Sequence, residues 1–446
     1  MSKINDNNLV PKLRFPDFAK DKEWILNQLG NVYSFITTNS FSRDDLNYNN
    51  GEVKNIHYGD IHTKFSTLFD ITKEIVPFIN ESIPLDKFKQ ENYCKEKDMI
   101  FADASEDLKD VGKSIELVNL NNEKLLSGLH TIHARQINDE IAVGFGGYLF
   151  LNENIRKQIQ RESQGAKVLG ISATRLSNIN IFYPQKKTEQ QKIASCLSSL
   201  DGIITAESQK LEVLKDHKKG LLQNLFPQKS KTIPKFRFKE FVGEWKNVSL
   251  GSLIEIKGRI GYRGYTTNDI VEKGKGAITF SPSNIDDNNQ LNFDKATYIS
   301  WEKYYESPEI MLQDGFTVLV KTGSSFGKAV FIKDLPEKTT INPQLVVLKP
   351  KNINPMFLFL LFCNSAIQNQ IKEAVVGGAI PTLSQESISN FEILIPPDKN
   401  KKEQEKIANT LSSIDDFINA QIQKIEALNL HKNGLLQGLF PSINNE

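Results

Sequence analysis

One long segment of this sequence is written twice. Residues 189–227, "EQQKIASCLSSLDGIITAESQKLEVLKDHKKGLLQNLFP", align without a gap on residues 403–441, "EQEKIANTLSSIDDFINAQIQKIEALNLHKNGLLQGLFP", and well over half of the positions are identical. The period is far longer than that of a solenoid repeat, so the repeated unit is a whole domain with a helix. A chain of this kind is expected to fold as two copies of one frame.

Two shorter segments repeat in the same order before the long one. They pair residues 11–30 with 234–251 and residues 165–184 with 377–396. Between these segments, residues 40–160 and 255–375 look unrelated to each other in sequence. We therefore expect one frame, present twice, that carries two different inserts.

The long repeated segment has the pattern of a coiled-coil helix. Its apolar residues follow alternating steps of four and three, which form a seam that a partner helix covers. One slot of the seam is skipped at Glu207 and Gln421, and another at Lys218 and Lys432. Two equal helices related by a pseudo-two-fold axis run in opposite directions, so we expect an antiparallel coiled coil about 57 Å long at 1.5 Å per residue. The seam residues are Ile193, Leu197, Leu200, Ile204, Leu211, Leu214, Leu221, Leu225, Ile407, Leu411, Ile414, Ile418, Ile425, Leu428, Leu435 and Leu439.

Composition limits the possible classes of protein. A chain of 446 residues suggests two or three domains. Its net charge of +1 argues against a free-standing, non-specific nucleic-acid binder, which is usually strongly basic. The three cysteines lie far apart without disulfide or metal spacing, which indicates a reducing compartment. The longest apolar run, residues 356–363, is too short to span a bilayer, so we expect a cytoplasmic protein.

The repeated frame resembles a known family. Its marks are "PKLRF" followed by Trp24 and "LG", the stretch "SNINIFYP" that leads into "EQQKIA", and the ending "GLLQNLFP". Each has a closely similar second copy in the other half of the chain. In this doubled form they closely resemble the specificity subunit of type I restriction–modification systems. The resemblance covers the whole chain.

The resemblance implies a fold, a function and a set of partners. Each insert would be a target recognition domain of α+β, or mixed α/β, structure that reads one half of a split, asymmetric site in double-stranded DNA. The helices would set the spacing of the half-sites and bind two modification (methyltransferase) subunits, and two restriction (translocase–nuclease) subunits would complete the complex. S-adenosylmethionine, ATP and Mg would bind to those partners, whereas this chain would hold no cofactor or metal and have no catalytic site.

The same resemblance divides the chain into four consecutive segments. We expect a first recognition domain, a first spacer helix, a second recognition domain and a second spacer helix, which are residues 1–184, 185–228, 229–396 and 397–446.

The inserts offer candidate DNA contacts. Residues 257–265 combine basic and aromatic side chains with glycines, which suits guanine reading by arginine and close approach to phosphate. Residues 321–328 carry lysines and serines suited to phosphates, and two loops of the first insert carry similar polar side chains. The alternative for each candidate is an ordinary solvated surface. The candidates are Tyr58, His62, Lys64, Ser105, Lys109, Lys113, Lys257, Arg259, Tyr262, Arg263, Tyr265, Lys321, Ser324, Ser325 and Lys328.

Several motifs that suggest catalysis are incomplete. "GSSFGKA" is one residue short of a phosphate-binding P-loop, and Ala329 stands where the magnesium-binding hydroxyl belongs. "INPQL" lacks the second proline and the aromatic residue of the amino-methyltransferase motif. His130 and His133 lack further ligands at zinc spacing. The alternative function that uses the same frame is a coiled-coil scaffold joining two protein-binding domains.

Overall fold

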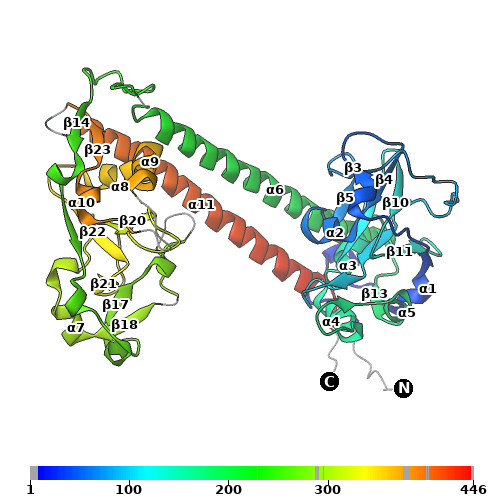
Figure 1. Ribbon diagram of the computed structural model, residues 1–446. Coiled ribbons are helices and arrows are strands. Elements are labelled where there is room, and N and C mark those ends of the chain that lie inside the picture. Colours follow the sequence, from blue (N-terminus) through cyan, green and yellow to red (C-terminus); the bar gives the residue numbers. More distant parts are fainter. Residues whose placement is uncertain are drawn as a thin grey trace. The chain divides into compact units, whose positions relative to one another are not determined.

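The computed structural model describes residues 9–228, 230–286, 291–294, 296–374, 382–397, 399 and 401–442. The chain forms two compact units (Figure 1). Unit 1 contains residues 1–208 and 423–446, and unit 2 contains residues 209–422. The boundaries fall inside two helices of 38 residues, α6 (Lys187–Asn224) and α11 (Lys402–Leu439). The predicted division into four consecutive segments stays a prediction, because the units divide the helices in their middle.

The insert of unit 1 is built on two sheets. One has the strand order β2-β11-β7-β9-β5, with β2 (Tyr33–Ile36), β11 (Thr131–Gln136), β7 (Met99–Ala102), β9 (Ser114–Asn119) and β5 (Leu68–Asp70). The other has the order β10-β4-β6-β3, with β10 (Lys124–Ser127), β4 (Val53–Ile56), β6 (Phe78–Ile79) and β3 (Leu46–Asn47). Two short pairs join β1 (Ile25–Gln28) to β13 (Asn180–Tyr183) and β8 (Ala104–Ser105) to β12 (Leu169–Gly170). The helices are α1 (Leu29–Val32), α2 (Tyr58–Thr63), α3 (Phe145–Leu149), α4 (Glu153–Glu162) and α5 (Ala173–Ser177).

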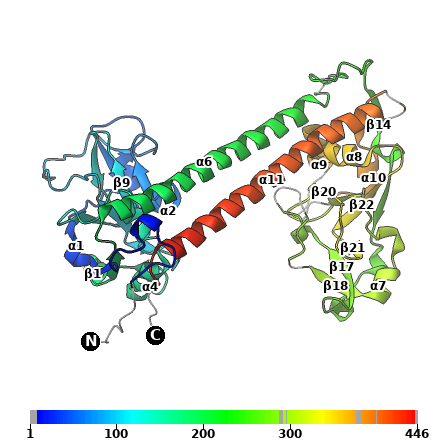
Figure 2. The same ribbon diagram turned by 180° about the vertical axis from the view of Figure 1, so that it is seen from behind.

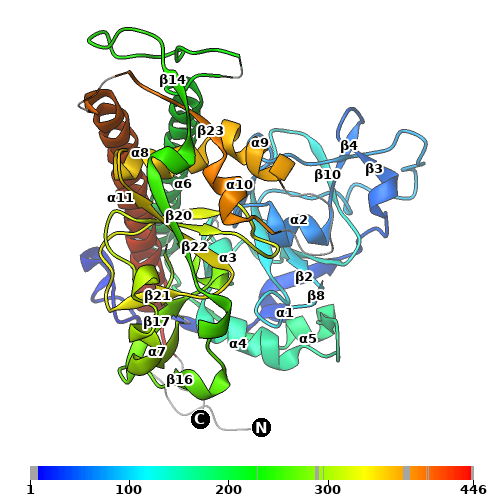
Figure 3. The ribbon, with the colours of Figure 1, turned by 60° about the vertical axis from the view of Figure 1, so that its left-hand side comes forward.

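The insert of unit 2 also has two main sheets (Figure 3). The first has the order β15-β22-β19-β20, with β15 (Ile254–Gly258), β22 (Leu345–Pro350), β19 (Thr317–Val320) and β20 (Ala329–Phe331). The second has the order β16-β18-β17-β21, with β16 (Ile270–Val271), β18 (Thr297–Ser300), β17 (Gly276–Phe280) and β21 (Thr339–Ile341). A short pair joins β14 (Lys246–Ser249) to β23 (Glu392–Ile395). The helices are α7 (Trp301–Tyr305), α8 (Pro355–Cys363), α9 (Ser365–Ala374) and α10 (Gln385–Ser389).

The two inserts share one strand-pairing plan although their sequences look unrelated. β11 lies antiparallel to both β2 and β7, and β22 lies antiparallel to both β15 and β19. β10 lies parallel to β4, as β21 lies parallel to β17. The predicted mixed α/β fold with an internal repeat is confirmed, and the repeat extends into the inserts.

Continuous apolar runs explain where the cores lie. The strands β7 and β19 are buried along their whole length, as expected for central strands covered on both faces. The apolar run of residues 356–363 lies within α8, where Asn354 caps the helix and Pro355 takes its first position. Six side chains of α8 are buried in the core of unit 2. None of the helices that the structure describes is long and apolar enough to cross a membrane.

Within each unit α6 and α11 lie side by side and antiparallel (Figure 1 and Figure 2). In unit 1, Asp201 pairs with Lys432 and Glu207 with Lys424, so the partner number falls as the α6 number rises. In unit 2, Lys218 pairs with Asp415. The residues predicted for the seam are all buried or half-buried. Three of the skipped slots, at Glu207, Lys218 and Lys432, hold ion pairs that cross from one helix to the other.

Each repeated helix ending packs in the frame of the opposite repeat. Phe440, at the end of α11, stacks on Phe145 at 5.6 Å between ring centroids and meets Trp24 at 5.7 Å, all in unit 1. Phe226, at the end of α6, stacks on Phe357 at 5.2 Å and meets Trp245 at 6.0 Å in unit 2. The ending is therefore written twice because each copy completes the core of a unit that begins in the other repeat.

Candidate nucleic-acid interface

In unit 1 three separate segments meet beyond the end of β7. Asp103 donates its backbone N–H to the carbonyl of His130 at 3.0 Å, and Ile171 donates to the carbonyl of Asp103 at 2.8 Å. Ala104 and Gly170 pair in the short β8–β12 ladder. The loop after β7 is thus tied to the β10–β11 turn and to the segment before α5.

Unit 2 repeats the same three connections. Lys321 donates its backbone N–H to the carbonyl of Gln344 at 2.9 Å, and Leu383 donates to the carbonyl of Lys321 at 2.8 Å. Thr322 and Thr382 form an isolated bridge where unit 1 has its β8–β12 ladder. Residues 103–113 and 321–328 are therefore the same loop in the two repeats. This loop carries the candidates Ser105, Lys109 and Lys113 in unit 1 and Lys321, Ser324, Ser325 and Lys328 in unit 2.

Both loops end in the same way. Gly112 donates to the carbonyl of Ala102 at 3.0 Å, and Gly327 donates to the carbonyl of Val320 at 2.8 Å. The two glycines have φ of 64° and 83°, a left-handed conformation that glycine adopts readily. A lysine follows each of them, so Lys113 and Lys328 stand at corresponding positions.

A further connection follows the edge strand of each first sheet. The backbone of Asn39, after β2, donates to the carbonyl of Ser127 at the end of β10 at 3.0 Å. The guanidinium Nε of Arg259, after β15, donates to the carbonyl of Ile341 at the end of β21 at 3.0 Å. Residues 259–265 of unit 2 and the polar stretch 37–42 of unit 1 therefore correspond.

One of the predicted base contacts, Arg259, is buried and hydrogen-bonded within its own unit. This residue is 6% exposed, and its guanidinium also donates to Thr340 Oγ1 and to the carbonyl of Arg263, both at 3.3 Å. Burial lowers the pKa of this guanidinium, and the ring of Tyr265 lies 5.5 Å from it. The side chain anchors the loop through these internal hydrogen bonds, and its predicted role as a DNA contact stays a prediction.

The remaining candidates of unit 2 stay predictions as DNA contacts. Lys257 pairs with Glu255 at 2.9 Å, and Arg263 donates to the carbonyl of Glu306 at 3.2 Å. The side chain of Tyr262 lies outside the described residues. In the loop after β19, Ser324 is exposed, and the half-buried candidates are Lys321, Ser325 and Lys328.

In unit 1 the structure joins two candidate groups into one surface. Lys113 Nζ donates to the carbonyl of His62 at 2.7 Å, which links the loop after β7 to α2. His62 Nε2 lies 3.0 Å from the carbonyl of Ala104 in the same loop. The ring of Tyr58 contacts that of His62 at 6.1 Å and that of His130 at 5.2 Å.

The other candidates of unit 1 lie around this surface. Lys64, at the end of α2, pairs with Asp60 at 3.0 Å and bonds to Tyr48 Oη at 3.1 Å. Ser105 Oγ accepts the backbone N–H of Asp107, and Lys109 is exposed. Whether these side chains touch DNA stays a prediction.

Sequence reasoning missed a pocket beside this surface. It encloses about 580 Å³ and is lined by Thr37, Thr38, Asn39, Ser40, Lys87, Phe88, Lys89, Glu91, Asn92, Asp103, Leu129, His130 and Thr131. Two lysines and three hydroxyl side chains from residues 37–40 give it the donors and acceptors that nucleic acids bind. The polar stretch "TTNS" directly after a strand was the available signal.

A buried ion pair fixes the start of each long helix to its own frame. Glu189 is 1% exposed and accepts hydrogen bonds from Arg14 Nε at 2.7 Å, Arg14 Nη2 at 2.8 Å and Trp24 Nε1 at 3.4 Å. Its hydrogen bonds raise the pKa of the Arg14 guanidinium. Unit 2 repeats this arrangement with the glutamate Glu403, the arginine Arg237 and the tryptophan Trp245. These residues are present in both copies of the frame, and they tie the start of each helix to the frame segment of its own repeat.

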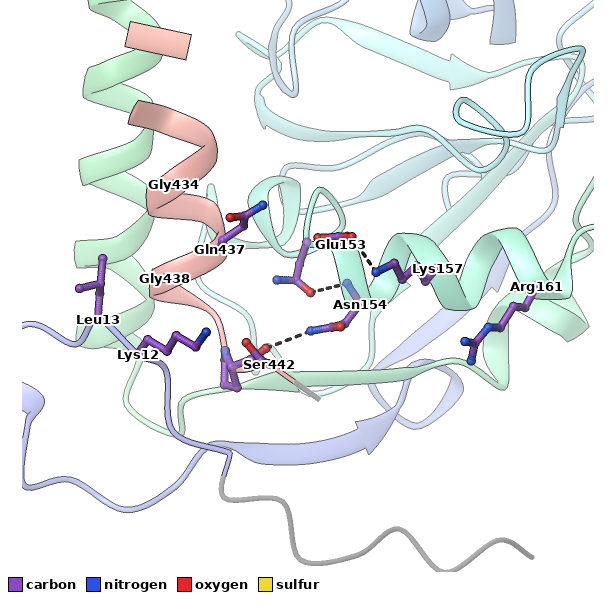
Figure 4. Close-up of a pocket in the computed structure, with 12 residues that line it drawn as sticks. Lys12, Leu13, Glu153, Asn154, Lys157, Arg161, Gly434, Gln437, Gly438 and Ser442 are labelled. Carbon is purple, nitrogen blue, oxygen red and sulfur yellow. Dashed lines mark hydrogen bonds and ion pairs between the residues drawn. The ribbon is translucent and has the colours of Figure 1, made fainter. Parts of the chain in front are cut away.

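A second pocket lies where α11 ends against α4 in unit 1 (Figure 4). It encloses about 760 Å³, and its lining includes Lys12, Lys157, Arg161 and Gly438. Asn154 Nδ2 donates to the carbonyl of Pro441 at 3.2 Å across its floor. Unit 2 has a pocket of about 490 Å³ at the corresponding place, lined by Gln223, Pro227, Asn364 and Glu373 among others.

The described residues contain no group of three or more histidine, cysteine, aspartate or glutamate side chains placed to hold a metal ion.

The chain contains two domains of the same topology. In each domain the polar loops lie together, and each domain is joined to a coiled-coil helix. This arrangement defines a protein with two recognition domains. The type I restriction modification DNA specificity domain matches residues 21–216 and again residues 243–429. The chain therefore belongs to the family of type I restriction–modification specificity proteins.

Related proteins agree with this assignment. The type I restriction enzyme MjaVIII specificity subunit of Methanocaldococcus jannaschii is 22% identical over 302 residues, which are 66% of this chain and 69% of that protein. The putative MjaX specificity subunit of the same organism is 24% identical over 366 residues, which are 80% and 81% of the two chains.

Solved structures share the fold. The type I restriction–modification S subunit from M. genitalium has a TM-score of 0.57 at 14% identity, over 98% of this chain and 100% of that one. A chain from a study of complex assembly and conformational transition of the type I R-M system has a TM-score of 0.56 at 14% identity, over 94% and 98% of the chains.

Proposed function

We propose that this chain selects the DNA target of a type I restriction–modification complex, with each insert reading one half of a split, asymmetric site. One observation carries the proposal. The same main-chain hydrogen bonds hold the loops after β7 and after β19, while the side chains on those loops differ. A shared scaffold with different side chains is what two half-sites of different sequence require, since base edges are read by side-chain donors and acceptors.

The frame supports a spacing role for the helices. A buried glutamate fixes the start of each helix, and the aromatic ending of each helix completes the opposite core. A helix fixed at both ends holds a constant length of 1.5 Å per residue. We infer that α6 and α11 set the number of unread base pairs between the half-sites.

The partners follow from the family. We propose that the helices dock two methyltransferase subunits, that two translocase–nuclease subunits join them, and that S-adenosylmethionine, ATP and Mg bind there. This chain then contributes target choice and no catalysis. Its net charge of +1 fits a protein that needs partners to enclose DNA, and it would work in the cytoplasm, where that DNA lies.

The test is methylation in a host that lacks other modification systems. The chain is expressed with its modification subunit, and genomic DNA is sequenced for methylated adenine. We expect one split motif with a fixed gap, no methylation when either subunit is omitted, and no methyl transfer by the purified chain alone. Methyl transfer by this chain alone would refute the non-catalytic role.

The alternative is a coiled-coil scaffold that joins two protein-binding domains. It predicts that the purified complex enriches no sequence from a random DNA library, even when the methyltransferase is present. The polar loops of both units favour DNA, because their side chains supply the hydrogen-bond donors and acceptors that nucleic acids bind.

A further inference from the structure

The two repeats hold opposite charges at one position of the shared scaffold. The backbone N–H of Asp103 donates to the β10–β11 turn, and its carbonyl accepts from the segment before α5. The backbone N–H of Lys321 donates to the β21–β22 turn, and its carbonyl accepts from the segment before α10. The four hydrogen bonds are 2.8–3.0 Å long and join corresponding residues in the two units. The backbone at this position is therefore the same, and the side chain alone differs.

The neighbour across this position differs as well. In unit 1 the carbonyl partner of Asp103 is His130, and in unit 2 the carbonyl partner of Lys321 is Gln344. His130 Nδ1 lies 3.2 Å from Asp103 Oδ1, and the two side chains are 50% and 31% exposed. Gln344 is exposed. Both positions thus present a pair of polar side chains at the surface.

The unit 1 pair is held in place by its surroundings. The ring of Tyr58 packs on His130 at 5.2 Å, and both Asp103 and His130 line the pocket of about 580 Å³. His130 has a φ of 55°, which is uncommon for any residue other than glycine. A strained residue that the fold retains at a pocket points to a binding role.

The chemistry of the two pairs is complementary. A carboxylate accepts hydrogen bonds only, and one bond to His130 leaves it acceptor capacity. A lysine donates only, and a glutamine can do both. In the major groove a carboxylate accepts from the exocyclic amino group of cytosine, whereas lysine donates to the O6 and N7 of guanine.

We propose that residues 103 and 321 are corresponding specificity-determining positions of the two half-sites. Asp103, aligned by His130, selects a base that offers an amino group, and Lys321, beside Gln344, selects a base that offers acceptors. This inference rests on the proposed function of the chain as a DNA reader.

The test uses the full-length chain in complex with its modification subunit. Bound DNA is enriched from a random duplex library and sequenced, for the wild type and for the variants Asp103→Ala and Lys321→Ala. Asp139→Ala is the matched control, because Asp139 is a paired carboxylate of unit 1 that lies outside the loop cluster and bonds to Lys97 and Lys187.

We expect each variant to relax one half-site only. Asp103→Ala should lower the preference at one base pair of the first half-site by about 5- to 150-fold, the range of one good base contact, with the second half-site unchanged. Lys321→Ala should do the converse, and Asp139→Ala should enrich the wild-type motif. If Asp103→Ala enriches nothing, Asp103→Glu, which keeps the acceptor, should recover the motif.

Three results would overturn the inference. The first is an unchanged motif in both alanine variants. The second is a uniform loss of affinity for all sequences, which would indicate a phosphate contact. The third is a failure of Asp103→Glu to restore binding, which would indicate a role in loop structure. A wild-type complex that enriches no split motif would instead refute the proposed function itself, so the two failures are distinguishable.

Discussion

The spacing role of the helices can be tested by lengthening both of them at the boundary between the units. Four residues are inserted between Ser208 and Gln209 in α6, and four between Ile422 and Gln423 in α11. These two sites occupy equivalent positions in the two repeats. Both lie at the boundary between the units, so neither insertion is placed between residues that belong to the same unit. The ion pairs Asp201–Lys432 and Lys218–Asp415 therefore keep their register.

The expected change follows from helix geometry. Four residues add about 6 Å and turn the helix by about 40° beyond one full turn. DNA rises about 3.4 Å per base pair, so the unread gap should grow by one or two base pairs. The bases of each half-site should not change, because no reading loop moves within its own unit. The four-residue insertion is a stutter in the seam, so some loss of affinity is expected.

A second variant with seven inserted residues at each site separates length from seam damage. It adds about 10.5 Å, or about three base pairs, and leaves the seam within about 20° of its original direction. Three base pairs also turn the second half-site by about 100° around the duplex, since DNA has 10–10.5 base pairs per turn. The assay is sequencing of the methylated motif of each variant. An unchanged gap with full methylation in both variants would refute the idea that the helices measure the site.

Three further predictions concern the frame and the core of unit 1. Replacing Arg14 by methionine leaves the buried Glu189 without its ion-pair partner and should lower the free energy of unfolding by about 3–5 kcal/mol. Replacing both residues by apolar ones should restore most of this loss. Urea titration measures both variants, and a loss below about 1 kcal/mol for the single variant would contradict the argument. Phe440→Ala should cost about 3–5 kcal/mol and speed hydrogen exchange at the end of α11, whereas equal exchange would show that the ending does not anchor the helix. Burial raises the pKa of Glu116 from 4.5 to about 7, so the folded protein holds more protons than the unfolded chain in that range. The free energy of unfolding should therefore fall by on the order of 3 kcal/mol as the pH rises from 4.5 through 7, and E116Q should remove most of this slope in urea titrations at pH 5 and pH 8.

The sequence predicts the frame well because the frame depends on periodic and strongly constrained residues. The seam of α6 and α11 follows from the spacing of its apolar side chains, and their antiparallel direction follows from the repeat. The polar slots at Glu207 and Lys218 look like gaps in a pattern when the helices are considered singly. Their meaning depends on Lys424 and Asp415 of the other helix, and only a paired register shows it.

The reciprocal packing of the helix endings could not be derived from the sequence. Nothing in "GLLQNLFP" specifies whether Phe226 returns to its own domain or joins the next one. The choice depends on helix length, because a helix of 38 residues carries its end far from the domain where it starts. Phe226 therefore meets Trp245, which follows it in the chain, and the first domain is completed by Phe440 from the C-terminal end.

The inserts show why reading residues are harder to predict than frame residues. Sequence composition favours Arg259 as a base reader, since arginine among glycines and tyrosines is typical of DNA-binding loops. In the structure that arginine donates a hydrogen bond to the carbonyl of Ile341, at the position where Asn39 of unit 1 donates to the carbonyl of Ser127. An arginine and an asparagine thus make equivalent internal hydrogen bonds in two loops of unlike sequence. Only the shared backbone shows at which positions the side chains are free to differ between the two units. These positions lie in the short segments that carry Asp103 and Lys321. If these segments read the two half-sites, as proposed, the half-sites can change independently, because main-chain hydrogen bonds hold the loops while their side chains differ.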